Sequence, residues 1–245
     1  MGHFLNHEFD KNNRTKTVVI YGCGSSINDL TDLDHYTLSQ FDGVAFNWFV
    51  FSHIPVTYYL VREQANIPKR VHGDETIDNF YNLINRYYKK SLLVIHDLKN
   101  HSPDAYDYSQ NCDKFIPSHI TVKDVKLKGN GPGIENWRKE DIFKDGLYHG
   151  KSTMTNAMHF AVWMGYERIV FAGVDLYDSR YFWMGEKTRY SVKNKKKTKE
   201  SKHQTSNDTL SLVKKVKQVY PDIKMCTYNK KSLLSNAIGV WNGQT

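Results

Sequence analysis

Several features that would place the chain in a class at once are missing from its 245 residues. The three cysteines, Cys23, Cys112 and Cys226, lie far apart and are odd in number. This excludes a disulfide framework and a C-x-x-C metal site, and it favours a reducing compartment. No run of about eighteen apolar residues occurs, so we expect no membrane-spanning helix. Residues 1–16 form a polar N-terminal extension without the apolar core of a signal peptide, which predicts a cytoplasmic protein.

Easily read nucleotide and metal motifs are also lacking. The chain has no Gly-Lys-Ser/Thr of a P-loop, and its Gly22-Cys23-Gly24 lacks the third glycine of G-x-G-x-x-G. Asp175-Leu176-Tyr177-Asp178 is not the D-x-D that binds a metal–nucleotide in many sugar transferases. We therefore expect no metal and no cofactor.

Positive charge is in excess, with 34 Lys and Arg against 26 Asp and Glu and a formal net charge of +8. This excess predicts an anionic partner. Much of it lies in the segment 187–205, which we interpret as a basic, lid-like loop or as a peripheral contact with an anionic membrane at its inner face. The alternative is a solvated loop without a role in binding. No recognised nucleic-acid module accompanies it, so we expect no nucleic acid. A noncatalytic basic protein that binds nucleic acid or membrane through these lysines remains an alternative.

Short apolar runs alternate with segments of helical periodicity along the whole chain. The pattern predicts strands at 18–21, 43–47, 56–61, 91–96, 168–172 and 223–227, and helices at 28–38, 74–89, 152–164, 206–220 and 232–238. Residues 103–137, rich in Pro, Gly, Asn and aromatics, show no clear period and are expected to form an irregular excursion. This alternation predicts a single α/β domain, Rossmann-like, over residues 1–245, with a mainly parallel sheet flanked by helices.

Two strand ends carry small polar residues. The first is the end of the strand 18–21, which is followed by the loop 22–26. The second is the end of the strand 168–172, which is followed by Asp175 and is preceded in the chain by a helix that starts at Ser152. Ligands of open α/β sheets bind where strands end and helices begin, and helix starts attract phosphates. The predicted nucleotide or donor contacts are Gly22, Cys23, Gly24, Ser25, Ser26, Asn47, Ser152, Thr153 and Asp175. The alternative for the loop 22–26, called the glycine loop below, is a plain tight turn, and for Asn47 a simple strand end.

Three further residue types suit group transfer without a metal. The hydroxyls of Tyr177 and Tyr181 and the guanidinium of Arg180 would stabilise a leaving phosphate, unless they merely cover the end of the sheet. His203, after the lysines, has the side chain that most often deprotonates a hydroxyl near neutral pH. The alternative for His203 is a solvated residue without a catalytic role.

The order of these pieces resembles the bacterial sialyltransferases of glycosyltransferase family forty-two, the lipooligosaccharide enzymes that use CMP-sialic acid. The matching pieces follow one another over most of the chain, at 21–26, 46–49, 152–177, 203–208 and 229–236. The resemblance implies a GT-A-like fold and a metal-independent, inverting transfer from a CMP-sugar donor to a glycan or glycolipid acceptor, in the synthesis of lipopolysaccharide or capsule.

The resemblance also implies a role for individual residues. His203 would be the general base on the acceptor hydroxyl, and Tyr177 and Tyr181 would hold the CMP phosphate as it leaves. Asn47, Thr153 and the loop 22–26 would bind nucleotide and donor. Arg62 and Arg180 are candidates for contacts with donor or acceptor.

The chain departs from the family at two places. It has Leu-Val-Arg-Glu at 60–63 where the family has Asn-Pro-Ser or Thr-Pro-Gly, and Gly-Lys-Ser-Thr-Met at 150–154 where the family has Arg-Ile-Thr-Ser-Gly. Both places lie near the donor sugar and the nucleotide in the family, so CMP-Kdo or another nonulosonic acid donor is an alternative. A pyrophosphokinase-like enzyme using ATP and Mg²⁺ is a second one, disfavoured because carboxylates around Asp175 are sparse.

Overall fold

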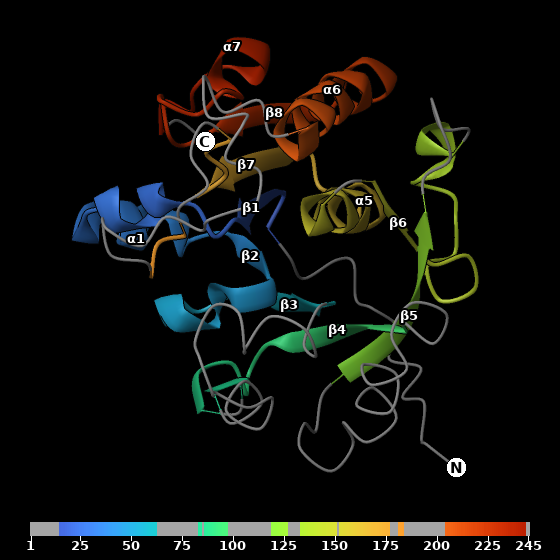
Figure 1. The fold of residues 1–245 in the computed structure, drawn as a ribbon, viewed down its shortest axis with the longest axis horizontal. Helices are drawn as coiled ribbons and strands as arrows, with labels where there is room; N and C mark the ends of the chain where they lie inside the picture. Colours follow the sequence, from blue (N-terminus) through green and yellow to red (C-terminus); the bar gives the residue numbers. More distant parts are fainter. Residues whose placement is uncertain are drawn as a thin grey trace.

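A computed structural model of the chain describes residues 15–62, 83–84, 86–97, 119–126, 133–150, 152–176, 181–183 and 204–243. These residues form an eight-stranded sheet in the order β6-β5-β4-β3-β2-β1-β7-β8, and all its pairings are parallel (Figure 1). The strands are β1 (Thr17–Tyr21), β2 (Asp42–Phe46), β3 (Tyr58–Val61), β4 (Leu92–Asp97), β5 (His119–Lys126), β6 (Leu147–His149), β7 (Arg168–Ala172) and β8 (Lys224–Thr227). The helices are η1 (Ser25–Asp29), α1 (Asp32–Leu38), η2 (Asn47–Ser52), η4 (Ile134–Asn136), α5 (Thr153–Trp163), α6 (Gln204–Val219) and α7 (Ser235–Ile238).

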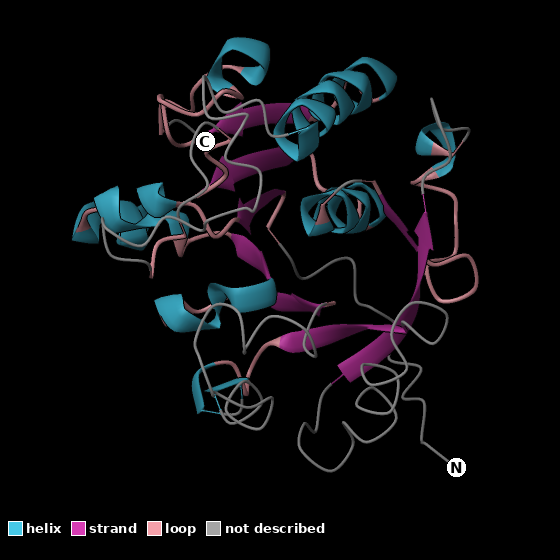
Figure 2. Cartoon of the chain, viewed as in Figure 1, coloured by secondary structure: helices cyan, strands magenta, loops and turns pink. Residues whose placement is uncertain are grey.

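Helices cover both faces of the sheet, and the central strand shows why (Figure 2). Every residue of β1 is buried, as expected of a parallel strand that has helices on both sides. Val18 and Ile20 pack in one apolar cluster with α5 and α6, whereas Val19 and Tyr21 pack in the other with α1 and η2. The predicted α/β fold with a parallel sheet between helices is therefore confirmed.

The order of the strands reverses beside β1. From β1 the chain adds β2 to β6 on one side, and α5 then carries it back to β7 on the other side of β1. In open parallel sheets, ligands bind at the carboxyl ends of the strands where the order reverses. The carboxyl ends of β1, β2 and β7 are therefore where a site is expected.

The ends of two helices follow from their sequence. Thr31 caps α1 with its side chain while Asp34 bonds back to the Thr31 amide, a reciprocal capping box. α5 runs from Thr153 to Trp163, and Gly165 follows with a φ of 79°, which a glycine adopts at little cost. The prediction of a helix over 152–164 is confirmed to within one residue at each end.

Two expectations were wrong in detail. The excursion at 103–137 was expected to be irregular, but it contains β5, which pairs with β4 and β6 and extends the sheet. The second strand was expected to include Asn47, but β2 ends at Phe46 and Asn47 has a φ of 51° at the start of η2. Most of the helix predicted at 74–89, and the segment 187–203, lie outside the described residues. In the described part of the chain, no helix is both long and apolar enough to cross a bilayer.

Candidate functional site

The loop after β1 packs directly against the loop after β7. Gly22 and Gly24 donate their amides to the carbonyls of Ala172 and Gly173, at 2.7 and 2.8 Å. A Cβ on Gly22 would lie 2.4 Å from the Gly173 oxygen, closer than real Cβ atoms come to a backbone oxygen. The two glycines therefore allow the two strand ends to touch, which is a packing reason for the Gly-x-Gly sequence.

Asp175 is the polar centre of this contact. Its side chain is buried, and its carboxylate accepts bonds from the Ser26 amide at 3.0 Å, from the Ser26 hydroxyl and from Asn229 Nδ2 at 3.1 Å. The Ser25 hydroxyl lies 3.4 Å from the same carboxylate. Asp175 thus holds the loop 22–26, β7 and the segment after β8 together.

These bonds restrict how the loop can bind a ligand. Three of its amides, those of Gly22, Gly24 and Ser26, already donate to chain atoms. A phosphate cradle of successive amides needs them to point at the anion. The loop therefore does not hold a phosphate through these three amides, and its remaining groups suit the ribose or base of a nucleotide better.

The end of β2 meets the start of α5. Asn47 donates through Nδ2 to the Thr153 hydroxyl at 3.1 Å, and Tyr59 donates its hydroxyl to the Asn47 carbonyl at 2.6 Å. The amide oxygen of Asn47 is buried and has no hydrogen-bond partner among the described residues. An acceptor buried without a donor costs free energy, so it marks a position where a ligand donor would be favourable.

The start of α5 is not capped by its own first side chain. Ser152 has extended backbone angles and makes no capping bond in the described structure; its hydroxyl lies 3.3 Å from that of Thr209 on α6. The first amides of a helix carry partial positive charge and bind anions. Asn47, Thr153 and Ser152 therefore surround a helix terminus of the kind that binds a phosphate or carboxylate.

The segment 181–183 pairs with the glycine loop. Tyr181 forms an antiparallel bridge with Gly24, and Phe182 donates its amide to the Cys23 carbonyl at 3.0 Å. Tyr181 is 37% exposed and stacks on Trp183, with 4.6 Å between ring centroids. The structure thus places Tyr181 beside the loop 22–26, held by its backbone and by a stacking partner.

The thiol of Cys23 is a structural group. It lies 3.7 Å from the Phe46 carbonyl, between β1 and β2, and burial raises its pKa well above the usual value. A thiol held neutral in this way is a poor nucleophile. Cys23 therefore contributes packing at the site rather than chemistry.

The structure brings together the predicted site residues that follow β1, β2 and β7, those at the start of α5, and Tyr181. Arg62 directly follows β3, whose neighbour β2 leads into Asn47, so it lies at the same edge of the sheet. Tyr177, Arg180 and His203 lie outside the described residues.

Two histidine clusters between β6 and α5 were not predicted. His149, the last residue of β6, pairs with Asn156 on α5, and His159 is buried among Trp137, Tyr148 and Glu140. The partners come from separate elements, so no local motif in the sequence signals them.

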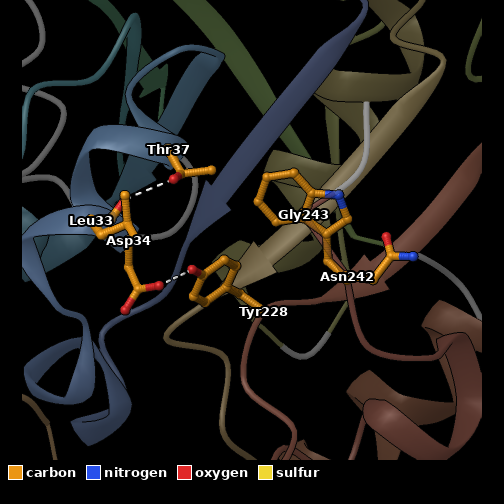
Figure 3. A pocket seen from close by; sticks show the side chains of 7 residues that line it. Leu33, Asp34, Thr37, Tyr228, Asn242 and Gly243 are labelled. Atoms are coloured by element: carbon orange, nitrogen blue, oxygen red, sulfur yellow. Dashed lines mark hydrogen bonds between the residues drawn. The ribbon is translucent and has the colours of Figure 1, made fainter.

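A surface hollow of about 480 Å³ lies elsewhere, between α1 and the segment after β8 (Figure 3). Asp34 points at Tyr228 across it, and the same carboxylate accepts bonds from the amide and hydroxyl of Thr31. None of the predicted site residues lines it, and its one carboxylate is already engaged. Among the described residues, no group of three or more His, Cys, Asp or Glu side chains is arranged to hold a metal ion.

Comparison with known proteins finds similar structures but no similar sequences. No known protein family matches the chain, and no curated protein matches it in sequence. Solved structures do match. The sialyltransferase CST-II with a trisaccharide acceptor and CMP is 17% identical, with a TM-score of 0.52 over 91% of this chain and 85% of that one. A variant of CST-II with CMP gives 17% and 0.55 over 92% and 86% of the two chains. The monofunctional α-2,3-sialyltransferase Cst-I from Campylobacter jejuni gives 15% and 0.53 over 94% and 81%. The chain therefore has a sialyltransferase-like fold.

Proposed function

We propose that the protein is a glycosyltransferase that moves a sialic acid, or a related 2-keto sugar acid, from its CMP ester to a glycan hydroxyl. The observation that carries this proposal is the meeting of Asn47, Thr153 and the glycine loop at the strand reversal, with the Asn47 amide oxygen buried and lacking a donor among the described residues. The fold shared with enzymes crystallised with CMP supports it. In this proposal the fold is of the GT-A type and the nucleotide spans the ends of β1, β2 and β7.

The chemistry of such a donor suits the residues present. The acceptor hydroxyl attacks the anomeric carbon from the face opposite the phosphate, so the configuration inverts. The new C–O bond forms as the bond to the CMP phosphate breaks, and CMP leaves with the bonding electrons. His203 takes the proton of the hydroxyl. Tyr177 and Tyr181 donate hydrogen bonds to the departing phosphate, and the start of α5 adds partial positive charge. The proposed reaction therefore needs no metal, because a single phosphate leaves.

The donor sugar is the least specified part of the proposal. Residues 60–63 and 150–154 differ from the pattern of glycosyltransferase family forty-two at positions close to the donor sugar and nucleotide in that family, so CMP-Kdo is the second candidate. In this proposal Arg62, which follows β3, meets a carboxylate or hydroxyl of either sugar. The lysines of 187–205 would close over the donor as a lid or meet an anionic membrane at the cytoplasmic face.

Release of CMP tests the proposal directly. The protein is incubated with CMP-sialic acid and with CMP-Kdo, each with and without EDTA, and CMP is measured over time. We expect release from one donor, undiminished by EDTA. Absence of release from both, even by slow hydrolysis, would refute the proposal. Selective thermal stabilisation by ATP with Mg²⁺ rather than by CMP would support the pyrophosphokinase alternative instead.

A further inference from the structure

The hollow between α1 and the segment after β8 combines apolar and polar side chains (Figure 3). Its volume of about 480 Å³ lies within the range of roughly 300–1,000 Å³ that is usual for small-molecule sites. Leu33, whose side chain is 71% exposed, and the ring of Trp241 supply apolar surface. Thr37, Asp34 and Tyr228 supply oxygen atoms. Such a mixture suits a ligand that has both an apolar face and polar groups.

The hydroxyl protons of the hollow are used within the protein. The Thr37 hydroxyl donates to the Leu33 carbonyl at 2.7 Å, and the Tyr228 hydroxyl donates to Asp34. Burial and the hydrogen bond to Asp34 raise the pKa of Tyr228 well above its usual value, so this hydroxyl keeps its proton near neutral pH. A hydroxyl that has donated its proton still has lone pairs that accept. Thr37 and Tyr228 therefore present acceptors, and they suit a ligand that brings the donors.

The charge of the lining disfavours an anion. Asp34 is the only charged residue among those that line the hollow, and none of them is a lysine or an arginine. The bond from Tyr228, together with bonds from the Thr31 hydroxyl at 2.7 Å and the Thr31 amide at 2.8 Å, lowers the pKa of Asp34. A phosphate or carboxylate would meet this ionised group without a lining cation, and an ammonium group would compete with three donors. A neutral ligand with hydroxyl groups fits best.

The hollow lies next to the candidate site but is separate from it. Tyr228 directly follows β8, and the next residue, Asn229, donates through Nδ2 to Asp175 at 3.1 Å. Leu33 lies in the first turn of α1, which follows the glycine loop and η1 along the chain. Both walls of the hollow therefore begin at the carboxyl edge of the sheet, where the candidate site also lies.

We propose that the hollow binds one neutral sugar ring of a glycan, with sugar hydroxyls donating to the oxygens of Thr37 and Tyr228 and the C–H face of the ring against Leu33 and Trp241. A pyranose has the required combination of hydroxyl donors around its edge and an apolar face, and it carries no charge. The inference goes beyond the proposed function, because it concerns binding at a second place and involves no transfer.

Binding is measured without any CMP-sugar. The chain has five tryptophans, so the indole N–H signal of Trp241 is one of five in a ¹H–¹⁵N spectrum, and it is assigned by triple-resonance spectra together with the signals of Asn242 and Thr37. Lactose is the neutral probe, and glucuronate and galacturonate are the anionic counterparts of its two rings. We expect lactose to shift these signals with a dissociation constant on the order of millimolar, as suits a few hydrogen bonds, and the two uronates to bind at least about tenfold more weakly.

Thr37→Val tests the position of the ligand. It removes the hydroxyl but keeps the shape of the side chain, so we expect the dissociation constant for lactose to rise about five- to tenfold, the effect of one lost hydrogen bond. Ser39→Ala is the matched control, because Ser39 makes the same kind of bond, to the Tyr36 carbonyl at 2.8 Å, and does not line the hollow. Thr37→Phe places a large ring at the same position and should abolish the shifts.

The outcomes separate this inference from the proposed function. Absence of a shift in these signals even at about 100 mM lactose overturns the inference and leaves the proposed function standing. Equal binding of lactose and the uronates, or unchanged affinity in Thr37→Val and Thr37→Phe, overturns it as well. Lactose binding that is weakened by the Thr37 variants but not by Ser39→Ala supports it, even if the protein releases no CMP and the proposed function fails.

Discussion

Asn47 and Thr153, 106 positions apart in sequence, join the end of β2 to the start of α5 through a hydrogen bond of 3.1 Å. The backbone of Asn47 is held by the Tyr59 hydroxyl, and its φ of 51° turns the chain sharply. Asparagine adopts this left-handed conformation more readily than most residues. One residue therefore satisfies two demands, a backbone turn and an amide group directed at the helix start.

Replacing Asn47 separates these two demands. Asn47→Gly keeps the left-handed backbone but removes the amide, so we expect CMP affinity to fall about five- to tenfold, the effect of a lost hydrogen bond, with a small change in stability. Asn47→Ala should lose the same affinity and a further 1–2 kcal/mol or so of unfolding free energy, because alanine resists a positive φ. Calorimetric titration with CMP and urea unfolding measure the two effects.

Thr153→Val is the control for that experiment, since it removes the hydroxyl that Asn47 contacts but keeps the shape of the side chain. We expect a smaller loss of CMP affinity than for Asn47→Gly. If Asn47→Gly binds CMP as tightly as the wild type, the Asn47 amide does not contact the nucleotide.

Asp175 gives a second prediction, on stability. Asp175→Asn turns one acceptor oxygen into a donor, which faces either the Ser26 amide at the position of Oδ2 or the Ser26 hydroxyl and Asn229 Nδ2 at the position of Oδ1. The mismatch is buried, so we expect a loss of about 1–3 kcal/mol in unfolding free energy and a weaker hold on the glycine loop. Ser25→Ala removes only the 3.4 Å contact at the edge of the same carboxylate and should cost much less. Equal losses for the two variants would show that Asp175 does not organise the loop.

The elements with a strong local signal could be predicted from the sequence. β1 and β7 are short, largely apolar runs, and α5 starts after a serine and ends before Gly165. β5 was missed because its surroundings are rich in Pro, Gly and Asn and because its sequence, HITVKDVK, mixes charged residues into the apolar pattern. Such a strand is recognised only when its neighbours β4 and β6 are known.

The sequence indicates where the candidate site lies in the fold, but not the hydrogen bonds within it. Small polar residues at the ends of two apolar runs are enough to indicate the loops after β1 and β7, because ligands of open parallel sheets bind at strand ends. That Asp175 binds the Ser26 amide, 149 positions away, has no signature in the sequence. The same holds for the pairing of His149 with Asn156, because the two residues come from separate elements, β6 and α5.

His159 predicts how stability depends on pH. Burial lowers the pKa of His159 to about 3, below the value near 6.5 of an unfolded chain. Between these values the unfolded chain binds a proton and the folded one does not, so unfolding free energy falls as the pH drops below about 6.5, by up to about 1.4 kcal/mol per pH unit. Burial raises the pKa of Glu140. At pH values just above the pKa of this carboxyl in the unfolded chain, the folded state therefore binds more protons there than the unfolded state, which opposes the slope caused by His159.

His159→Asn tests that slope. Asn keeps an acceptor for the Tyr148 amide but cannot be protonated. We expect the variant to be less stable than wild type at pH 7.5, because it leaves a cavity beside Trp137, but to lose less stability between about pH 6.5 and 4.5. Urea unfolding at several pH values measures both. Parallel pH profiles for the two proteins would mean that another group causes the acid sensitivity.

His203 carries the last prediction, which concerns rate. A general base that takes the acceptor proton acts in the transition state and contributes little to binding of the product nucleotide. His203→Ala should therefore lower kcat by roughly 10²–10⁴-fold while leaving CMP affinity nearly unchanged. Tyr181→Phe removes a hydroxyl proposed to stabilise the leaving phosphate, and it should lower kcat without the change in pH profile expected for His203→Ala. Lys196→Ala removes one of several lysines and should have little effect. Transfer rates and CMP binding of the three variants decide the matter, and near wild-type transfer by His203→Ala would remove His203 from the mechanism.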